Sequence, residues 1–394
     1  MSGLLGVFRN EFHRIFTVRP AFSVLILGVA FYAIFYPQPY LNEALRNVPI
    51  AVVDRDGTQS SRDFIRRVDA TPDVRVVAEL PDVASAEREV FARRIDGILV
   101  IPQYFERELL HGRPSPVALY ADASYFLIYQ RVAGAVVTVA RTIGVEIETA
   151  RLIGIGVEPV IAAAATDPLR LTAVPLFNPQ GGYATYLLPA AFVLILQQTL
   201  LMGVALLRTL PDVDPAEPNT GGKGPPPFTV IAGKLLAYLA LQAITLPVYL
   251  IVLPYLYGLP RLGGVVPILI FAVPFVLSVA GLGFVVAGIF RRPIRVSLFL
   301  AAFGLPIFMV AGFSWPSEAI PRAIRIVSYI VPSTSAIDGF VKLSQLGAPL
   351  SAVNSEFLTL SALAIFYNLI ALLQMVREAK PPDLVVSEST LPAS

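Results

Sequence analysis

The stretch PAFSVLILGVAFYAIFY, Pro20–Tyr36, decides the fold class of this chain. It is almost entirely apolar, and no charged residue occurs between Arg19 and Glu43. As a helix rising roughly 1.5 Å per residue, it is about 26 Å long, which is close to the thickness of the hydrocarbon core of a bilayer. The stretch therefore predicts a membrane-spanning helix over residues 20–39, retained rather than cleaved, because no small-residue cleavage site follows it.

The composition of the whole chain agrees with this prediction. Hydrophobic residues make up 55% of the 394 residues and charged residues only 15%, whereas an average soluble domain has roughly 25% charged residues. Cysteine is absent, which excludes disulfides and thiolate metal sites. No basic stripe with interleaved aromatic residues indicates a nucleic-acid partner.

Five further apolar runs are about long enough to cross a bilayer. They are Tyr183–Leu207, Val230–Tyr257, Val265–Phe290, Val296–Phe313 and Phe357–Val376. The sequence thus predicts an α-helical polytopic membrane protein with about six transmembrane helices, the last five in a membrane domain over residues 179–378.

Basic residues predict the orientation of the spans, because cytoplasmic loops carry an excess of Lys and Arg. Four basic groups fall on one side if both termini are cytoplasmic, while Arg322, Arg325 and Lys342 lie on the other side. The four groups are Arg9, Arg14 and Arg19; Arg208, Lys223 and Lys234; Arg291, Arg292 and Arg295; and Arg377 and Lys380. We expect a multi-pass protein of a bacterial-type inner membrane.

Between the first and second spans, over residues 40–178, charge returns and short β-branched runs alternate with amphipathic helices. The predicted strands are Val48–Asp54, Val74–Leu80, Gly97–Pro102 and Pro116–Asp122, and the predicted helices are Ser61–Val68, Val83–Ile95 and Phe126–Ile153. This alternation favours an inserted extracytoplasmic α/β domain with parallel strand pairing.

Asp54, Asp56 and Gly57 superficially match the start of a calcium loop. The match fails, because the sixth loop position is Gln59 instead of glycine and the twelfth is Ile65 instead of glutamate. We interpret these residues as a turn from a strand into a helix.

Residues 1–19 form an amphipathic pattern, which predicts a cytoplasmic helix lying along the inner leaflet. Arg9, Asn10, His13 and Arg14 share the polar face. Two interpretations are open: a docking surface for a cytoplasmic partner, or a plain membrane anchor.

Catalytic chemistry finds no support. GGKGPP, Gly221–Pro226, lacks the remainder of a phosphate-binding loop, and the two histidines, His13 and His111, are expected on opposite sides of the membrane. The chain is therefore predicted to be no enzyme and to bind no cofactor itself.

Polar residues are rare inside the predicted spans, which disfavours an ion-coupled transporter. Gln197, Gln198 and Gln242 are exceptions, either as interhelical hydrogen-bond donors or as part of a translocation path. Close helix packing is the preferred interpretation of Gly283 and Ala287.

Three segments outside the spans have their own character. Residues 314–354 are broken by prolines, which predicts a periplasmic segment of short re-entrant helices. The candidate site residues of this segment are Trp315, Pro316, Pro321, Pro332 and Asp338. The cytoplasmic loop 208–228, RTLPDVDPAEPNTGGKGPPPF, is typical of a flexible linker. Residues 379–394 predict a disordered cytoplasmic tail.

Four motifs in their order and spacing resemble the ABC type-2 permease family, in the branch of export permeases with a large periplasmic insertion. They are VPIAVVDRDGTQSSRDFIR (Val48–Arg66), DASYFLIYQR (Asp122–Arg131), LFNPQGGYATYLLPA (Leu176–Ala190) and GFSWPSEAIPRAIRIVSYIVPSTSAIDGF (Gly312–Phe340). The resemblance covers about residues 1–378.

This resemblance implies a permease that pairs with a second copy of itself or a related permease and is powered by ATP on a separate ABC ATPase subunit. The large outer domain suggests a periplasmic adaptor as a further partner. By resemblance, the candidate ATPase-coupling residues are Arg9, His13, Arg14, Arg208, Asp212, Asp214 and Glu217. The loop 208–228 departs from the charged loop usual in that family.

The substrate class stays open among drugs, lipids, polysaccharide and peptide. A second function class is also open: a non-transporting membrane receptor or assembly factor, whose α/β domain binds a periplasmic ligand or partner. Co-purification of an ATPase distinguishes the two.

Overall fold

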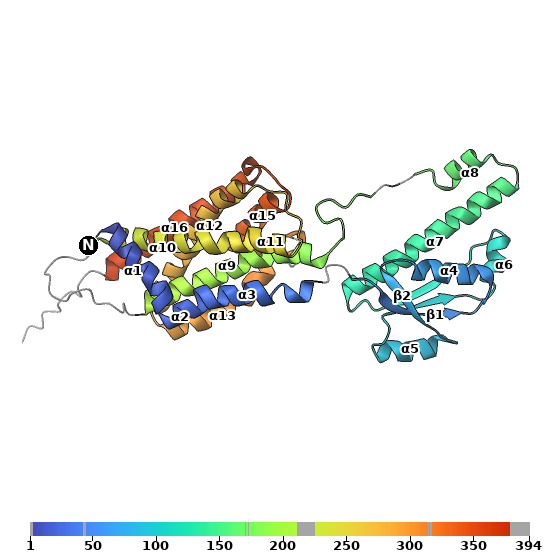
Figure 1. The fold of residues 1–394 in the computed structure, drawn as a ribbon, viewed down its shortest axis with the longest axis horizontal. Coiled ribbons are helices and arrows are strands. Elements are labelled where there is room, and N and C mark those ends of the chain that lie inside the picture. The colour runs from blue at the N-terminus through green and yellow to red at the C-terminus, as the bar shows by residue number, and fades with distance from the viewer. Residues whose placement is uncertain are drawn as a thin grey trace, which may run out of the picture. The chain divides into compact units, whose positions relative to one another are not determined.

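The computed structural model describes residues 3–41, 45–169, 171, 173–210, 225–313, 315 and 317–378. Within the chain, two compact units form (Figure 1): a helical bundle from Met1–Leu41 and Leu176–Ser394, and an α/β unit from Asn42–Pro175. Most of the loop 208–228, Pro316 and the tail 379–394 lie outside the described residues, so the predictions for them are not addressed by the structure.

The bundle is built around α9, Tyr183–Thr209, which is buried along most of its length. Phe192, Leu196, Leu200 and Val204 of α9 are fully enclosed. Around it lie α1 Leu4–Thr17, α2 Arg19–Phe22, η1 Ser23–Gly28, α3 Val29–Phe35, α10 Pro227–Pro247, η3 Val248–Val252, α11 Leu253–Leu256, α12 Val265–Phe290, α13 Pro293–Val310 and α16 Asn354–Glu378.

Small residues allow these helices to approach closely, as expected for Gly283. A Cβ atom at Gly283 of α12 would lie 2.9 Å from Cγ1 of Val204 in α9. A Cβ atom at Gly281 would lie 2.8 Å from Nδ2 of Asn368 in α16. Because lipid is as apolar as leucine, such close packing and interhelical hydrogen bonds hold membrane helices together.

Between α13 and α16, the described chain breaks into short helices, as the prolines predict. They are η4 Ser317–Ala319, α14 Arg322–Ser328, α15 Pro332–Ser344 and η5 Leu350–Val353. The helix α15 is buried against α9, α12 and α16, and its Phe340 packs edge-on against Phe271 and Phe275 of α12. Protein therefore covers α15, which is the condition for irregular backbone at membrane depth, whereas α14 is mostly exposed and buries only Ser328.

Seven helical segments of the described chain are long and apolar enough to cross a membrane, one more than the six expected. The additional segment is α7, Phe126–Gly154, in the α/β unit. Its Val132, Ala135 and Val136 are buried in the core beside the sheet. Length and composition cannot distinguish a span from a long helix that packs on a sheet, so the count of six spans stays a prediction.

The sheet of the α/β unit has the strand order β2-β1-β3-β4. Its strands are β1 Val48–Asp54, β2 Val74–Glu79, β3 Gly97–Ile101 and β4 Ala118–Ala121. β1 pairs in parallel with β2 and β3, as predicted, but β4 pairs antiparallel with β3. The short helix α6, Phe105–Leu110, and the turn after it reverse the chain, whereas a parallel return needs a full crossover.

Helices cover both faces of this sheet (Figure 1). On one face, α4, Gln59–Asp69, and α7 pack against Val52 and Leu99. On the other face, α5, Val83–Phe91, buries Ala86 against Val53 and Ile98. Burial on both faces explains why β1 is a continuous apolar run. The short helix α8, Pro159–Thr166, packs on α7.

The turn after β1 has the structure that the sequence predicts. Oδ1 of Asp54 accepts hydrogen bonds from the backbone N–H groups of Asp56 and Gly57 at 2.9 and 3.1 Å, and Oδ2 accepts one from the Ser61 hydroxyl at 2.7 Å. Thr58 caps α4 by accepting from the N–H of Ser61. The carboxylate of Asp54 is thus used to join the strand to the helix.

Candidate functional site

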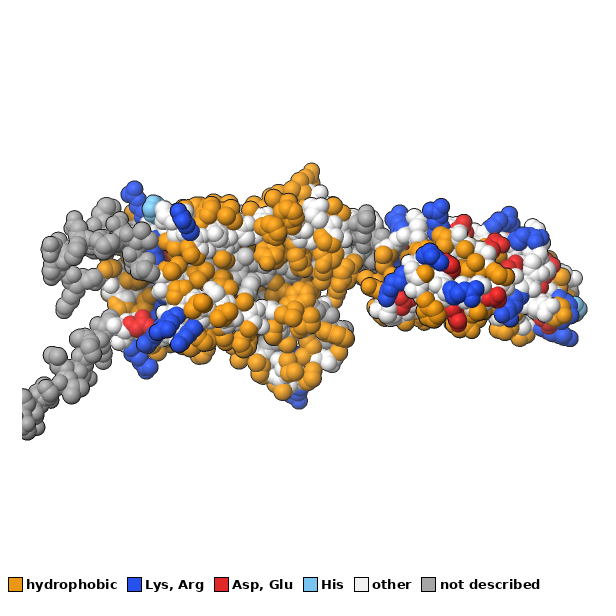
Figure 2. Space-filling model, turned by 90° about the horizontal axis from the view of Figure 1, so that it is seen from below, with side chains coloured by type: hydrophobic (Ala, Val, Ile, Leu, Met, Phe, Trp, Pro, Cys, Tyr) orange, Lys and Arg blue, Asp and Glu red, His pale blue; other side chains and the backbone are white. Residues whose placement is uncertain are grey.

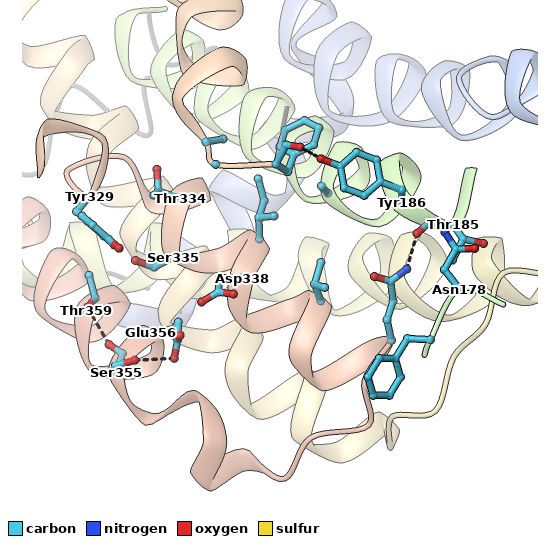
Figure 3. A pocket seen from close by; sticks show the side chains of 18 residues that line it. Asn178, Thr185, Tyr186, Tyr329, Thr334, Ser335, Asp338, Ser355, Glu356 and Thr359 are labelled. Carbon is cyan, nitrogen blue, oxygen red and sulfur yellow. Dashed lines mark hydrogen bonds between the residues drawn. The ribbon is translucent and has the colours of Figure 1, made fainter. Parts of the chain in front are cut away.

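A cavity of about 570 Å³ opens in the bundle beside the start of α9 (Figure 3). The ends of three further elements enclose it: the turn after α13, the helix α15 and the first turns of α16. Its lining comprises Phe177, Asn178, Thr185, Tyr186, Ala190, Ala311, Gly312, Phe313, Tyr329, Thr334, Ser335, Ile337, Asp338, Val341, Gln345, Ser355, Glu356 and Thr359.

Most of the wall is apolar or aromatic, and hydrogen bonds fix its two sides. The hydroxyl of Tyr186 donates to the backbone oxygen of Phe313, which joins α9 to the turn after α13. Nε2 of Gln345 donates to the backbone oxygen of Thr185 at 2.6 Å, which joins α15 to α9. Figure 3 shows Thr185 and Tyr186 on one side of the cavity, and Ser335, Asp338 and Glu356 on the other.

The charged side of the cavity holds two carboxylates that share one ammonium group. Nζ of Lys342 lies 2.8 Å from Oδ2 of Asp338 and 2.7 Å from Oε1 of Glu356. The Glu356 side chain is 9% exposed and also accepts from the Ser355 hydroxyl, whereas the Asp338 side chain is 55% exposed. Burial and the neighbouring carboxyl of Glu356 raise the pKa of Asp338 above its ordinary value.

Of the candidate residues in segment 314–354, only Asp338 lines the cavity among those described. Pro332 is the first residue of α15, and Pro321 precedes α14. Trp315 is exposed and follows the cavity-lining Phe313 by two positions. Glu356 and Lys342 were not among the predicted site residues. The signal for them is the pair Asp338 and Lys342 at helical spacing, followed by an isolated acidic residue at the start of an apolar helix.

The three glutamines of the predicted translocation path do not line this cavity. Gln197 donates to the Ser333 hydroxyl of α15 at 3.0 Å, and Gln198 donates to the Leu300 carbonyl of α13 at 3.0 Å. Gln242 accepts from Thr245 within α10. The first two make interhelical hydrogen bonds, which is the packing interpretation, while a role of all three in translocation stays a prediction.

At the opposite end of α9, a buried group of charges connects α1 to the bundle. Oε2 of Glu11 lies 3.1 Å from Nη1 of Arg14 and 3.2 Å from Nζ of Lys234, and Oε1 accepts from the Tyr238 hydroxyl. We call Glu11, Arg14, Lys234 and Tyr238 the Glu11 cluster. Burial alone would raise the pKa of Glu11, but Lys234, Tyr238 and Arg14 outweigh burial and lower it, so the carboxylate is ionised.

The structure encloses one residue of the predicted polar face of the first helix. Arg14 was expected on the polar, accessible face, yet its side chain is 3% exposed and donates to the backbone oxygens of Leu207 and Leu210 at 3.0 and 3.1 Å. The last carbonyls of a helix have no partner within it, and here Arg14 supplies one for α9.

The remaining candidate coupling residues differ in accessibility. Arg9 and His13 are exposed on α1. Arg208 is 8% exposed and donates to the Phe284 carbonyl at 2.6 Å and to Gln374 at 3.1 Å. Asp212, Asp214 and Glu217 lie outside the described residues. Figure 2 shows Lys and Arg side chains of the bundle gathered mainly toward its N-terminal end.

Comparison with known proteins connects this architecture to transport. The sequence pattern of the family described as "ABC-2 family transporter protein" matches residues 19–373. The chain belongs to this family. The match runs from the first apolar helix into α16, so both the cavity and the α/β unit fall within the ABC-2 region.

Two relatives are permeases. The chain is 23% identical over 326 residues to the linearmycin resistance permease protein LnrN of Bacillus subtilis (strain 168), covering 76% of this chain and 80% of that protein. It is 29% identical over 101 residues to the probable multidrug ABC transporter permease YbhS of Escherichia coli (strain K12), covering 25% of this chain and 27% of that protein. With its apolar helices, this ABC-2 chain is a multi-pass membrane protein and a transport component.

Proposed function

We propose that this chain is the permease subunit of an ABC exporter, which moves a substrate outward across an inner membrane while a separate subunit hydrolyses ATP. The observation that carries the proposal is the ABC-2 match across residues 19–373, joined to a bundle with a cavity at one end of α9. A second copy or a related permease completes the unit, with both termini in the cytoplasm and a periplasmic adaptor on the α/β unit.

The two ends of α9 support a coupling of ATP hydrolysis to transport. Thr185, Tyr186 and Ala190 near its start line the cavity, whereas Leu207 near its end accepts from Arg14 of α1. The intervening helix is about 40 Å long at roughly 1.5 Å per residue. A displacement of α1 therefore has a direct mechanical route to the cavity through one rigid element.

In this proposal, the exposed residues of α1 contact the ATPase and the buried residues attach α1 to the bundle. Arg9 and His13 face outward, available to an ATPase. Glu11 and Arg14 face inward and hold α1 to α9 and α10. In this proposal Arg14 and Arg208 are positioning residues, because their guanidinium groups bond within the bundle.

The test is purification of the chain with its native ATPase, followed by measurement of ATP turnover. Arg9→Glu is expected to weaken the complex and lower turnover, since the reversed charge repels an acidic docking surface. Arg322→Glu is the matched control. Arg322 is also exposed, but it belongs to α14, which ends just before the cavity-lining Tyr329 and so lies at the cavity end of the bundle instead of beside α1.

If wild type retains no ATPase under conditions that keep the bundle folded, the exporter proposal fails. A stable complex of the α/β unit with another protein would then favour the receptor or assembly function. Equal effects of the two charge reversals would remove α1 as the docking element.

A further inference from the structure

We propose that the cavity binds a hydrophobic organic cation, with Asp338 as the residue that contacts its positive charge. This inference names the substrate class of the proposed exporter and rests on that proposed function. It leaves open which molecule of this class is moved.

The charges around the cavity favour a cation over an anion. Two carboxylates, Asp338 and Glu356, line the cavity, and one ammonium group, that of Lys342, bonds to both. With all three groups ionised, this set carries a net charge of −1. Lys342 forms ion pairs with both carboxylates. The described lining therefore offers an anion no positive charge that is not already paired.

The two carboxylates differ in availability. Glu356 is nearly enclosed, and its oxygens accept from Lys342 and Ser355. Asp338 leaves more than half of its side-chain surface exposed while it bonds to Lys342. Asp338 is therefore the carboxylate that a ligand in the cavity can contact.

The rest of the wall favours an organic, apolar cation over a metal ion. Phe177, Tyr186, Phe313 and Tyr329 bring aromatic rings to the cavity, and such rings attract cations through their π faces. A volume of about 570 Å³ falls in the roughly 300–1,000 Å³ range of small-molecule sites and far exceeds what a single ion needs.

Tetraphenylphosphonium and tetraphenylborate provide a sharp test, because they share size and shape but carry opposite charge. The full chain would be titrated with each in detergent micelles. The readout is the emission of Trp315, which is the single tryptophan of the chain and lies two positions after Phe313. We expect a saturable change in emission with the phosphonium. The borate should bind at least about tenfold more weakly, because it carries the opposite charge near the carboxylate of Asp338.

Two variants test whether the phosphonium binds in the cavity beside Asp338. Asp338→Asn removes the accessible charge with little change of shape and is expected to weaken phosphonium binding about tenfold. Thr359→Lys adds a positive charge to the cavity lining from α16 and is expected to abolish phosphonium binding and to strengthen borate binding. Glu378→Gln, at the far end of α16, is the control and leaves both affinities unchanged.

Equal binding of the two probes, or binding that neither cavity variant alters, overturns the proposal. If Asp338→Asn does not fold, the Thr359→Lys variant alone tests whether the cation binds in the cavity. The exporter proposal is tested separately by ATPase co-purification: a chain that drives ATP turnover but shows no charge preference loses only the cation assignment. A chain that binds the phosphonium selectively without any ATPase keeps the site and loses the exporter function.

Discussion

The hydroxyl of Tyr238 in α10 donates a 2.5 Å hydrogen bond to Oε1 of Glu11 in α1, 227 positions away along the chain. Both side chains are buried, and Lys234 and Arg14 complete the Glu11 cluster around the carboxylate. A helix that merely floats at the membrane surface would not bury such a group, because an enclosed charge without partners is costly. The first helix is therefore a structural part of the bundle.

Loss of the Glu11 charge should destabilise the protein. Glu11→Gln removes the carboxylate that forms ion pairs with Lys234 and Arg14 inside the bundle, so we expect the free energy of unfolding to fall by about 3 kcal/mol. Denaturant titration in micelles measures it. The double variant Glu11→Gln/Lys234→Met should regain part of the loss, because the orphaned ammonium group is gone. A Glu11→Gln protein as stable as wild type would contradict the role of the cluster.

Two glycine-to-alanine changes, in two helices that both pack on α9, should change stability in opposite directions. A Cβ atom at Gly339 in α15 would collide with the fully buried ring of Phe271, so Gly339→Ala should cost about 1–3 kcal/mol. At Gly304 in α13 the new atom would lie an ordinary 3.5 Å from Gln198, and Gly304→Ala should stabilise by up to about 1 kcal/mol through helix propensity. Thermal unfolding of both variants is the measurement, and a shift of the same sign in both would refute this packing argument.

The α/β unit should contain an acid-sensitive carboxylate pair. Burial and the nearby Asp122 raise the pKa of Asp96 above its ordinary value. The charged form of Asp96 therefore costs stability above its folded-state pKa, and this cost vanishes below its unfolded-state pKa of about 3.9. Asp96→Asn should raise the unfolding temperature at neutral pH and change nothing in strong acid.

Asp82 is the control for this pH dependence. It caps α5 by accepting from the N–H of Ser85 at 2.7 Å, and this hydrogen bond lowers the pKa of Asp82. A lowered pKa stabilises the fold above the unfolded-state pKa and ceases to do so as pH falls through the folded-state value. Asp82→Ala should thus lower the unfolding temperature at neutral pH, opposite in sign to Asp96→Asn. The same sign for both would show that the carboxylates are not in these environments.

The turn at Asp54 should be structural and indifferent to calcium. Asp54→Ala removes the acceptor of two backbone N–H groups and of the Ser61 hydroxyl, so we expect a loss of about 2 kcal/mol. Asp63→Ala is the matched control. It removes exposed ion pairs to Arg66 and Arg67 and should cost less than about 1 kcal/mol. A rise in unfolding temperature on adding calcium would revive the metal interpretation of this loop.

The pattern of hydrophobic residues was sufficient to predict the bounds of those helices and strands whose residues are sorted by contact with water, lipid or the core. The apolar run Tyr183–Leu207 predicts α9 to within two residues, and the β-branched run Val48–Asp54 predicts β1 at both ends. Such runs are readable because each residue responds to its own surroundings, water, lipid or core, with period or length as the signal. The same signal fails at α7, where a helix lying on a sheet has the hydropathy of a span.

The sites depended on contacts between distant parts of the chain. By itself, the sequence determined the apolar helices, the strands of the α/β unit and the turn at Asp54. Only the tertiary structure decided that Arg14 is enclosed, because the unpaired carbonyls at the end of α9 come to it. It likewise brought Asp338 and Glu356 to one ammonium group across the gap between α15 and α16. Periodicity reports which face of an element is buried, but not which distant partner buries it.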